Sequence, residues 1–265
     1  MEALLCPVCK SELTKNGNAL RCANTHSFDT AKEGYVNLLT GSKSGSLIGD
    51  NREMARSRKS FLDKGYFEPA AKAVCRELMT LRPETVLDIC CGEGYYTQMI
   101  KESCECKVYG FDISKEMVRL AAKRKCGATF FVANMSDIPL EDNSIDCAVH
   151  LFAPLCEKEF LRVIKPGGYL ISVCPGTDHL WEMKAVLYDT PYKNEELCPE
   201  IDGFTAVKTF NSVHTAKLTC REDIDALFKM TPYYYHTSAQ DKEKLLTLDS
   251  LKTKIDFYIR IYRKD

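Results

Sequence analysis

Four residues near the start of the chain have the types and the spacing of a zinc site. They are Cys6, Cys9, Cys22 and His26, in the pattern C-x2-C-x12-C-x3-H. Zinc takes four thiolate or imidazole ligands at tetrahedral corners, and two short knuckles can supply them in pairs. Because protein ligands fill all four positions, we predict a structural ion that stabilises a small module. The alternative is a chance grouping in a chain that contains 14 cysteines.

A second group of residues could bind a nucleoside that carries a positive charge. Asp88 is followed by Gly92 and Gly94, and Asp112 lies 24 residues after Asp88. Glycines let the backbone turn sharply beside a ligand, and an acid at the end of the following strand can accept both ribose hydroxyls. Acidic side chains at Asp88 and Glu93 would repel a pyrophosphate but suit a cation. This pattern favours S-adenosylmethionine (SAM).

The glycine loop does not match the dinucleotide fingerprint, because Thr97 occupies the third glycine position of G-x-G-x-x-G. A glycine-containing turn in an unrelated α/β domain is the bland alternative. The run Lys165–Gly168 before a later strand, together with Asp88 and Asp112, strengthens the SAM interpretation.

The elements that must position these residues alternate from about residue 65 onward. Apolar runs rich in β-branched residues predict strands at 85–90, 107–113, 129–133, 145–152, 168–175, 205–213 and 252–262. Amphipathic segments predict helices at 94–103, 114–125, 157–164, 178–188 and 221–230. This alternation predicts an α/β fold with a doubly wound, Rossmann-like sheet, which binds ligands at the carboxyl ends of its strands.

Composition divides the chain into three parts: a zinc-binding module at 1–40, a linker with a basic helix at 41–64, and the α/β domain at 65–265. Residues 40–50 are rich in Gly and Ser, which is typical of a loop. Between the two zinc knuckles, Asn16-Gly17-Asn18 predicts a turn that joins two short strands.

The predicted helix from Asn51 to Lys64 places Arg52, Arg56 and Lys59 on one face. A solvated helix face is one interpretation, and contact with a phosphate backbone is the other. Residues 1–60 carry nine Lys and Arg against six Asp and Glu, whereas the net charge of the whole chain is −1. The N-terminal part is therefore the part expected to meet a polyanion.

Composition also excludes several protein classes. Hydrophobic residues make up 45% of the chain, which is enough to bury a core and argues against disorder. No apolar run approaches the length of a membrane helix, and no secretory signal is visible at the N-terminus. Several cysteines fall inside predicted strands, where a free thiol packs as a small hydrophobe. We therefore expect a soluble protein of a reducing cytoplasm, without membrane contact.

These motifs together resemble the class I SAM-dependent methyltransferases. More narrowly, the chain resembles the RlmA family of large-subunit (23S) rRNA (guanine-N1)-methyltransferases along nearly its full length. The segments that carry the resemblance are the zinc ligands and the runs FDTAKEGYVNLL, FLDKGYFEP, DICCGEGYYT, FAP at 152–154 and PGTDHLWEMK.

The resemblance implies SAM and structural Zn²⁺ as cofactors, and it implies a set of cofactor-binding residues. Phe67 stands where the family places an aromatic residue, and Asp112 would hold the ribose. The remaining implied contacts are Asp88, Gly92, Glu93, Gly94, Tyr95, Asn134, Met135 and His179. One position departs from the family pattern D-I-G-C-G, because Cys90 replaces the first glycine.

The implied reaction is methyl transfer to guanine N1 in a hairpin of 23S rRNA, by an enzyme that could be a homodimer. N1 lies on the pairing edge of the base, so the guanine must be unpaired or flipped out. Substrate contacts are expected near Phe152–Pro154 or near the aromatic run 231–236, which could instead be a half-buried strand or turn. The catalytic base is not identified: the candidates are His150, Glu157 and His236.

Two other functions remain open at this level. The same fold could methylate a small molecule such as a quinone or lipid precursor, because the site and its appendages set function, not the fold. A non-catalytic RNA-binding protein with a retained SAM fold is the third possibility. The zinc module and the basic helix favour the RNA enzyme, and the intact Asp88, Gly92, Gly94 and Asp112 disfavour a non-catalytic protein.

Overall fold

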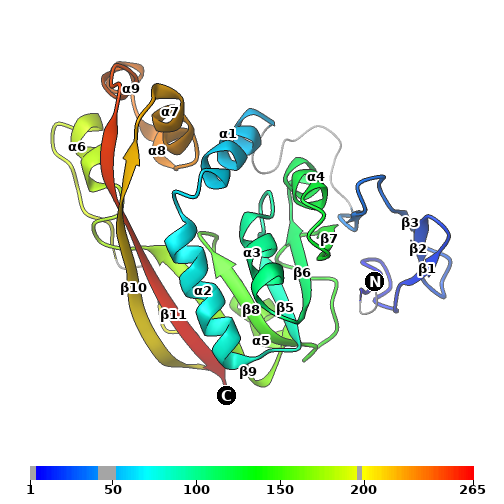
Figure 1. Cartoon of the computed structure of the whole chain (residues 1–265). Coiled ribbons are helices and arrows are strands. Elements are labelled where there is room, and N and C mark those ends of the chain that lie inside the picture. The colour runs from blue at the N-terminus through cyan, green and yellow to red at the C-terminus, as the bar shows by residue number, and fades with distance from the viewer. Residues whose placement is uncertain (1–3, 41–51, 196–198) are drawn as a thin grey trace.

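A computed structural model describes residues 4–40, 52–195 and 199–265. Eight strands of the described residues form the central sheet (Figure 1). They are β4 (Val36–Asn37), β5 (Thr85–Ile89), β6 (Lys107–Asp112), β7 (Thr129–Val132), β8 (Ile145–Leu151), β9 (Ile164–Pro175), β10 (Phe204–Leu218) and β11 (Leu251–Lys264). Their order in the sheet is β10-β11-β9-β8-β5-β6-β7-β4.

The strands from β4 to β9 run parallel, and β11 and β10 extend the sheet in antiparallel fashion. The order reverses between β5 and β8, which is the point where such sheets bind ligands. This topology confirms the expected doubly wound, Rossmann-like class.

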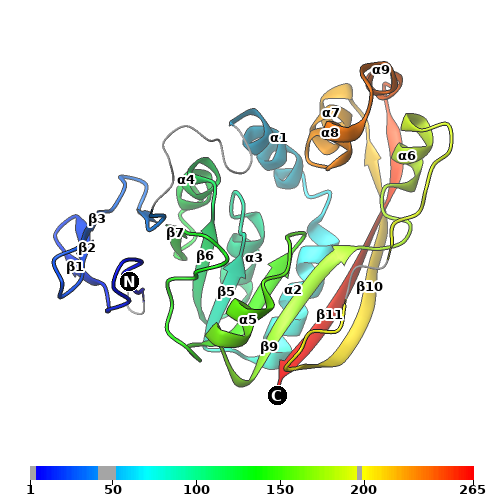
Figure 2. The ribbon, with the colours of Figure 1, turned by 180° about the vertical axis from the view of Figure 1, so that it is seen from behind.

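Helices cover both faces of the sheet. Successive side chains of a strand point to opposite faces, so Val86 packs with the helices of one face and Leu87 with those of the other. The first face is covered by α2 (Glu68–Leu81), α3 (Tyr95–Ser103) and α4 (Lys115–Lys123), and α5 (Glu157–Val163) covers the second. Figure 2 shows α5 from behind.

The N-terminal module is a small antiparallel sheet of β1 (Thr14–Asn16), β2 (Ala19–Arg21) and β3 (Ser27–Asp29). It is not separate from the α/β domain, because the chain continues from it into β4, which pairs with β7. Leu4 forms a bridge to Leu140, and the Leu5 N–H donates to the Pro139 carbonyl at 2.9 Å. Leu13 and Leu20 are buried in the same core as Leu140. The module and the sheet edge therefore share one apolar core.

The remaining helices gather beyond the carboxyl ends of the parallel strands, as both ribbon views show. They are α1 (Arg52–Asp63), α6 (Trp181–Leu187), α7 (Arg221–Lys229), α8 (Tyr233–His236) and α9 (Ala239–Leu246). Lys229 of α7 pairs with Glu53 of α1 at 2.8 Å. None of the described helices is long and apolar enough to cross a bilayer.

Most expected elements are present within a few residues of their predicted bounds. The short strands β3 and β4 and the helix α9 were not expected, and three further differences concern longer segments. Helix α2 was not expected, although Pro69 near its start and its buried Ala, Val and Leu positions are ordinary helix signals. Strand β10 extends to Leu218, because its pairing with β11 continues past Val213. The aromatic run 231–236, for which a half-buried strand or turn was the alternative interpretation, contains the short helix α8. Residues 41–50 of the loop predicted at 40–50, and Asn51, lie outside the described residues.

Candidate functional site

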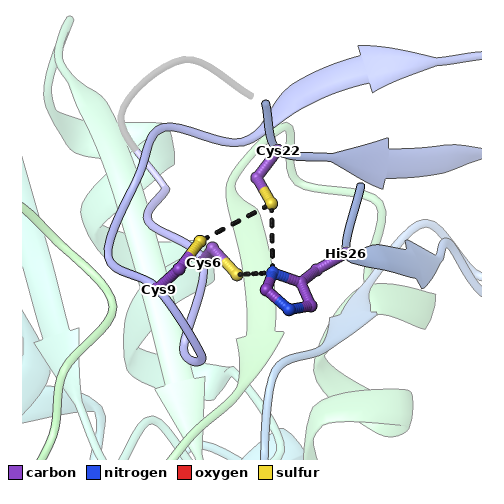
Figure 3. Close-up of side chains that lie close together, drawn as sticks. All are labelled: Cys6, Cys9, Cys22 and His26. Carbon is purple, nitrogen blue, oxygen red and sulfur yellow. Dashed lines mark hydrogen bonds between the residues drawn. The ribbon is translucent and has the colours of Figure 1, made fainter. Parts of the chain in front are cut away.

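The four predicted zinc ligands converge on one point (Figure 3). The Cys9 and Cys22 sulfurs are 3.7 Å apart, and His26 Nδ1 lies 3.5 Å from the Cys6 sulfur and 3.3 Å from the Cys22 sulfur. Bonds of about 2.3 Å to sulfur and about 2.0 Å to nitrogen imply edges of about 3.4–3.8 Å in a tetrahedron. The cluster therefore fits a structural zinc ion, which confirms the prediction from spacing.

Local backbone structure explains why these ligands converge. Lys10 and Thr25 adopt left-handed φ values of 58° and 66°, and each closes a turn back onto a ligand cysteine. The Lys10 N–H donates to the Cys6 carbonyl at 2.8 Å, and the Thr25 N–H donates to the Cys22 carbonyl at 3.1 Å. A hydrogen bond with Ser11 lowers the pKa of the Cys9 thiol to about 5, which favours the thiolate that binds metal.

A cavity of about 270 Å³ opens at the carboxyl ends of β5, β6 and β8. Its volume is close to the lower end of small-ligand pockets, about 300 Å³. The lining residues are Arg58, Leu62, Asp88, Cys90, Cys91, Gly92, Glu93, Tyr95, Tyr96, Asp112, Ile113, Met117, Leu151, Phe152, Ala153 and Pro154.

Asp112 ties the ends of β5 and β6 together at this cavity. Its carboxylate accepts the Gly92 N–H at 3.1 Å through one oxygen and the Ser114 N–H at 2.8 Å through the other. Gly92 has a φ of 55°, and a Cβ there would meet only the Arg58 side chain, at 4.0 Å. Gly94 is required for a different reason, since a Cβ would lie 2.8 Å from the Ala121 Cβ. The loop thus combines open backbone with close helix packing.

Cys90 adopts the left-handed conformation that a glycine would occupy without strain, with a φ of 55°. Its sulfur lies 3.9 Å from the Met135 sulfur, and burial raises the pKa of its thiol to about 12. Cys90, the residue that departs from the family pattern, is therefore strained and lies in the cavity wall.

Three of the four buried side-chain polar atoms without a hydrogen-bond partner, counted over the described residues, belong to the cavity lining. They are Asp88 Oδ1, Glu93 Oε1 and the Tyr96 hydroxyl. Buried polar groups are normally hydrogen-bonded, so such a group of orphans indicates a missing polar ligand. Two carboxylate oxygens suit the ammonium, hydroxyl and sulfonium groups of SAM, and the residues present fit this cofactor.

The two acids of the loop have different surroundings. Asp88 is fully buried, and its other oxygen accepts the Thr97 hydroxyl at 2.5 Å. Burial raises the pKa of this carboxyl to about 7. Glu93, by contrast, pairs with Arg124, whose Nε donates at 2.9 Å. The negative charge expected at Glu93 is thus largely balanced within the protein, and Asp88 and Asp112 remain to attract a cationic ligand.

The other predicted cofactor residues lie at different distances from the cavity. Tyr95 lines it, whereas Phe67 and His179 are buried beside one another, with ring centroids 6.2 Å apart. Both pack on Phe257, whose ring centroid lies 4.7 Å from that of the cavity residue Phe152. Burial lowers the pKa of His179 to about 3, so its ring is neutral.

Neither Asn134 nor Met135 is among the described residues that line the cavity. The Met135 sulfur lies 3.9 Å from the sulfur of Cys90, which does line the cavity. The Asn134 side chain accepts the Ser136 N–H at 3.0 Å. Their predicted contacts with adenine remain predictions.

Sequence reasoning did not single out Arg58, Leu62 and Tyr96, all of which line the cavity. Tyr96 directly follows the predicted Tyr95, so an extended loop motif could have found it. Arg58 and Leu62 come from α1, which is distant in sequence from the loop. Only the packing of α1 beside α3 reveals them.

The candidate catalytic bases are occupied or distant. His150 is buried, and its Nε2 hydrogen-bonds to the Pro154 carbonyl at 3.0 Å while its Nδ1 faces the Ser172 hydroxyl at 3.4 Å. It therefore holds the loop after β8 in place. Glu157 and His236 are exposed and absent from the cavity lining.

The aromatic and basic candidates for RNA contact are partly committed to other partners. Tyr233 donates to the Asn194 side chain at 3.1 Å. On α1, Lys59 pairs with Asp63 at 2.5 Å and Arg52 approaches Glu116 at 3.9 Å, while Arg56 is exposed. Phe152 is 40% exposed at the cavity, which makes it the most accessible aromatic side chain of the lining. Its backbone has a left-handed φ of 56°.

Comparison with known proteins adds independent findings. Residues 4–46 match the family model described as RlmA, N-terminal, a zinc ribbon, and residues 86–168 match a methyltransferase domain. The chain is 33% identical to a 23S rRNA (guanine(748)-N(1))-methyltransferase of Streptomyces fradiae, over 91% of this chain and 88% of that protein.

A second relative, from Micromonospora griseorubida, is named provisionally as a 23S rRNA (guanine-N(1)-)-methyltransferase. It is 32% identical over 88% of this chain and 87% of its own length. Among solved structures, one from work on the conversion of a disulfide bond into a thioacetal group during echinomycin biosynthesis matches with a TM-score of 0.52. That match has 18% identity and covers 74% of this chain and 82% of the other, so it supports the fold alone.

Proposed function

The chain belongs to the RlmA family of 23S rRNA (guanine-N1)-methyltransferases, and from that membership we propose that it methylates N1 of a guanine in 23S rRNA. The observation that carries the proposal is that one sheet supports both a cofactor cavity and a zinc module. The carboxyl ends of its strands form a cavity in which one oxygen each of Asp88 and Glu93 is buried without a partner, which fits SAM, and its β4 edge carries a zinc module typical of the family.

When bound, SAM supplies an activated methyl group on its sulfonium. The protein therefore has mainly to align the acceptor and exclude other nucleophiles. Asp112 would hold the ribose hydroxyls, and Asp88 would face the ammonium group. Gly92 provides backbone that a ligand can approach without meeting a side chain. Phe67, Glu93, Gly94, Tyr95, Asn134, Met135 and His179 complete the proposed cofactor set.

We propose that the guanine enters beside Phe152 and stacks on its ring, because an exposed aromatic side chain can hold a base taken out of its helix. His150 supports this contact by fixing the Pro154 carbonyl. The zinc module and the basic face of α1 would contact the phosphates of an rRNA hairpin, with Arg56 as the exposed member. A cytoplasmic location and a homodimer belong to the same proposal.

A methyl-transfer assay tests this function directly. Labelled SAM is incubated with 23S rRNA from cells that lack the enzyme, and with the isolated hairpin. N1-methylguanine blocks pairing, so a new reverse-transcription stop would identify the modified guanine. We expect one stop, and phosphate contacts should make the rate fall steeply with salt. SAM binding without incorporation into any RNA would reject the rRNA substrate and favour a small-molecule acceptor.

A further inference from the structure

The junction between α1 and α2, residues 64–67, connects two residues of the proposed cofactor site. Leu62, near the end of α1, lines the cavity, and Phe67 is a predicted cofactor contact. Inside the junction, Tyr66 stacks on Phe61 of α1 with ring centroids 4.8 Å apart. Phe61 in turn packs edge-on against Phe67 at 5.3 Å. The position of Tyr66 therefore affects both sides of the junction.

Two residues from the C-terminal part of the chain hold Tyr66 in place. Its hydroxyl donates to Asp223 Oδ2 on α7 at 2.7 Å, and its carbonyl accepts a hydrogen bond from His214 Nε2 on β10 at 2.8 Å. The other carboxylate oxygen of Asp223 accepts a hydrogen bond from the ammonium of Lys64. Helix α7 and strand β10 thus fix the junction, although they follow it by 148 to 159 residues in sequence.

Asp223 is a buried acid, with 4% of its surface exposed, and a buried carboxylate is costly unless hydrogen bonds satisfy it. Burial alone would raise the pKa of Asp223, but the hydrogen bonds from Lys64 and Tyr66 outweigh it and lower that pKa. Burial and the bond to Asp223 raise the pKa of Tyr66 to about 12, so its hydroxyl stays protonated and donates at neutral pH. The contact is therefore charge-assisted, which makes it stronger than a hydrogen bond between neutral groups.

We propose that Asp223 is a positioning residue for the cofactor cavity, which acts by fixing Tyr66. Through that contact it holds Leu62 and Phe67 where SAM binds, an inference that rests on the proposed cofactor but not on the proposed RNA substrate. A binding site is precise only where packing and further hydrogen bonds lock the residues that touch the ligand. Asp223 is not among the described residues that line the cavity, so it acts through the junction and not on the ligand.

Ligand binding without RNA tests the inference. Isothermal titration would measure the affinity of the full chain for S-adenosylhomocysteine (SAH), well below the thermal midpoint of each variant, so that a loss of stability alone does not change the affinity. Tyr66→Phe removes one hydroxyl, keeps the ring and should weaken SAH binding about 3- to 10-fold. Asp223→Ala should weaken it at least as much. The double variant should bind no more weakly than Asp223→Ala alone, because both residues act through one contact.

Lys229→Gln is the matched control, because Lys229 of α7 also pairs with α1, through Glu53 at the end of that helix away from the junction. This variant should keep the SAH affinity of wild type. Unchanged affinity in both Tyr66→Phe and Asp223→Ala would overturn the inference and leave Asp223 a purely structural residue. Additive losses in the double variant, or an equal loss in Lys229→Gln, would overturn it too, because general packing of α7 on α1 would then explain the effect. Wild-type protein that fails to bind SAH would reject both the cofactor assignment and this inference, whereas the rRNA assay tests the substrate separately.

Discussion

The carboxylate of Asp112 accepts the backbone N–H of Gly92 at 3.1 Å, which links the carboxyl ends of β5 and β6 across the cavity floor. Asp112 is the last residue of β6 and Gly92 lies in the loop after β5, yet each depends on the other. Asp112 fixes the left-handed turn at Gly92, and Gly92 orients the carboxylate that is proposed to receive the ribose.

Replacing Asp112 should therefore damage the site in two ways. Asp112→Ala removes the ribose acceptor and the support of the loop, and we expect SAH affinity to fall about 10- to 100-fold, since hydrogen bonds to charged groups are the strong ones. Titration calorimetry measures this loss. Asp142→Asn, on an exposed acid outside the cavity, is the control. Equal affinities for Asp112→Ala and the control would reject the assigned role.

Cys90 allows a test of backbone strain. Because a left-handed conformation costs a residue with a side chain about 1–2 kcal/mol, Cys90→Gly should relieve strain and offset the small loss of buried sulfur. Cys90→Val adds a β-branched side chain where φ is 55° and should destabilise the fold. Urea unfolding should thus rank the glycine variant at or above wild type and the valine variant clearly below it. A valine variant as stable as wild type would show that the turn is not strained.

The buried carboxyl of Asp88 predicts a pH dependence of stability. Its folded-state pKa, about 7, lies above the value of 3.8 for a free side chain, because burial disfavours the charged form. The folded state therefore binds this proton more tightly than the unfolded state. Its contribution to stability is fully present below about pH 4 and is lost as the pH rises through about 7.

Urea unfolding between about pH 5 and about pH 8 would measure this effect against Asp88→Asn, which cannot ionise. The stability of wild type relative to the variant should fall across that range. A constant difference would mean that Asp88 ionises normally in the folded chain.

The zinc site should support the whole chain, not only its module. The module shares a core with the sheet through Leu4, Leu13 and Leu20, and Leu4 bridges to Leu140. Cys9→Ser should abolish stoichiometric zinc, measured by atomic absorption, and lower the midpoint of the single thermal transition by about 5 °C or more. Cys126→Ser, on a half-buried cysteine far from the site in sequence, should retain zinc. Two separate transitions, with the later one unchanged, would contradict the shared core.

Local patterns along the chain were sufficient for the longer strands of the sheet, the α/β class and the zinc ligands, but not for the short strands β3 and β4. Strand and helix periodicity reflects burial on one or two faces, and C-x2-C-x12-C-x3-H brings its ligands together through short-range turns at Lys10 and Thr25. Asp88 and Asp112 could also be predicted as site residues from the sequence, because parallel strands end at one edge of a sheet. Helix α2 has comparable local signals, with Pro69 near its start and buried apolar positions along one side.

Only the tertiary structure decided which distant side chains meet at that edge. The pairing of Glu93 with Arg124, the approach of Arg58 from α1 and the attachment of β4 to β7 all join segments far apart in sequence. Such contacts depend on how helices pack across a completed sheet, which no local periodicity encodes. The charge balance of the cavity follows from these contacts.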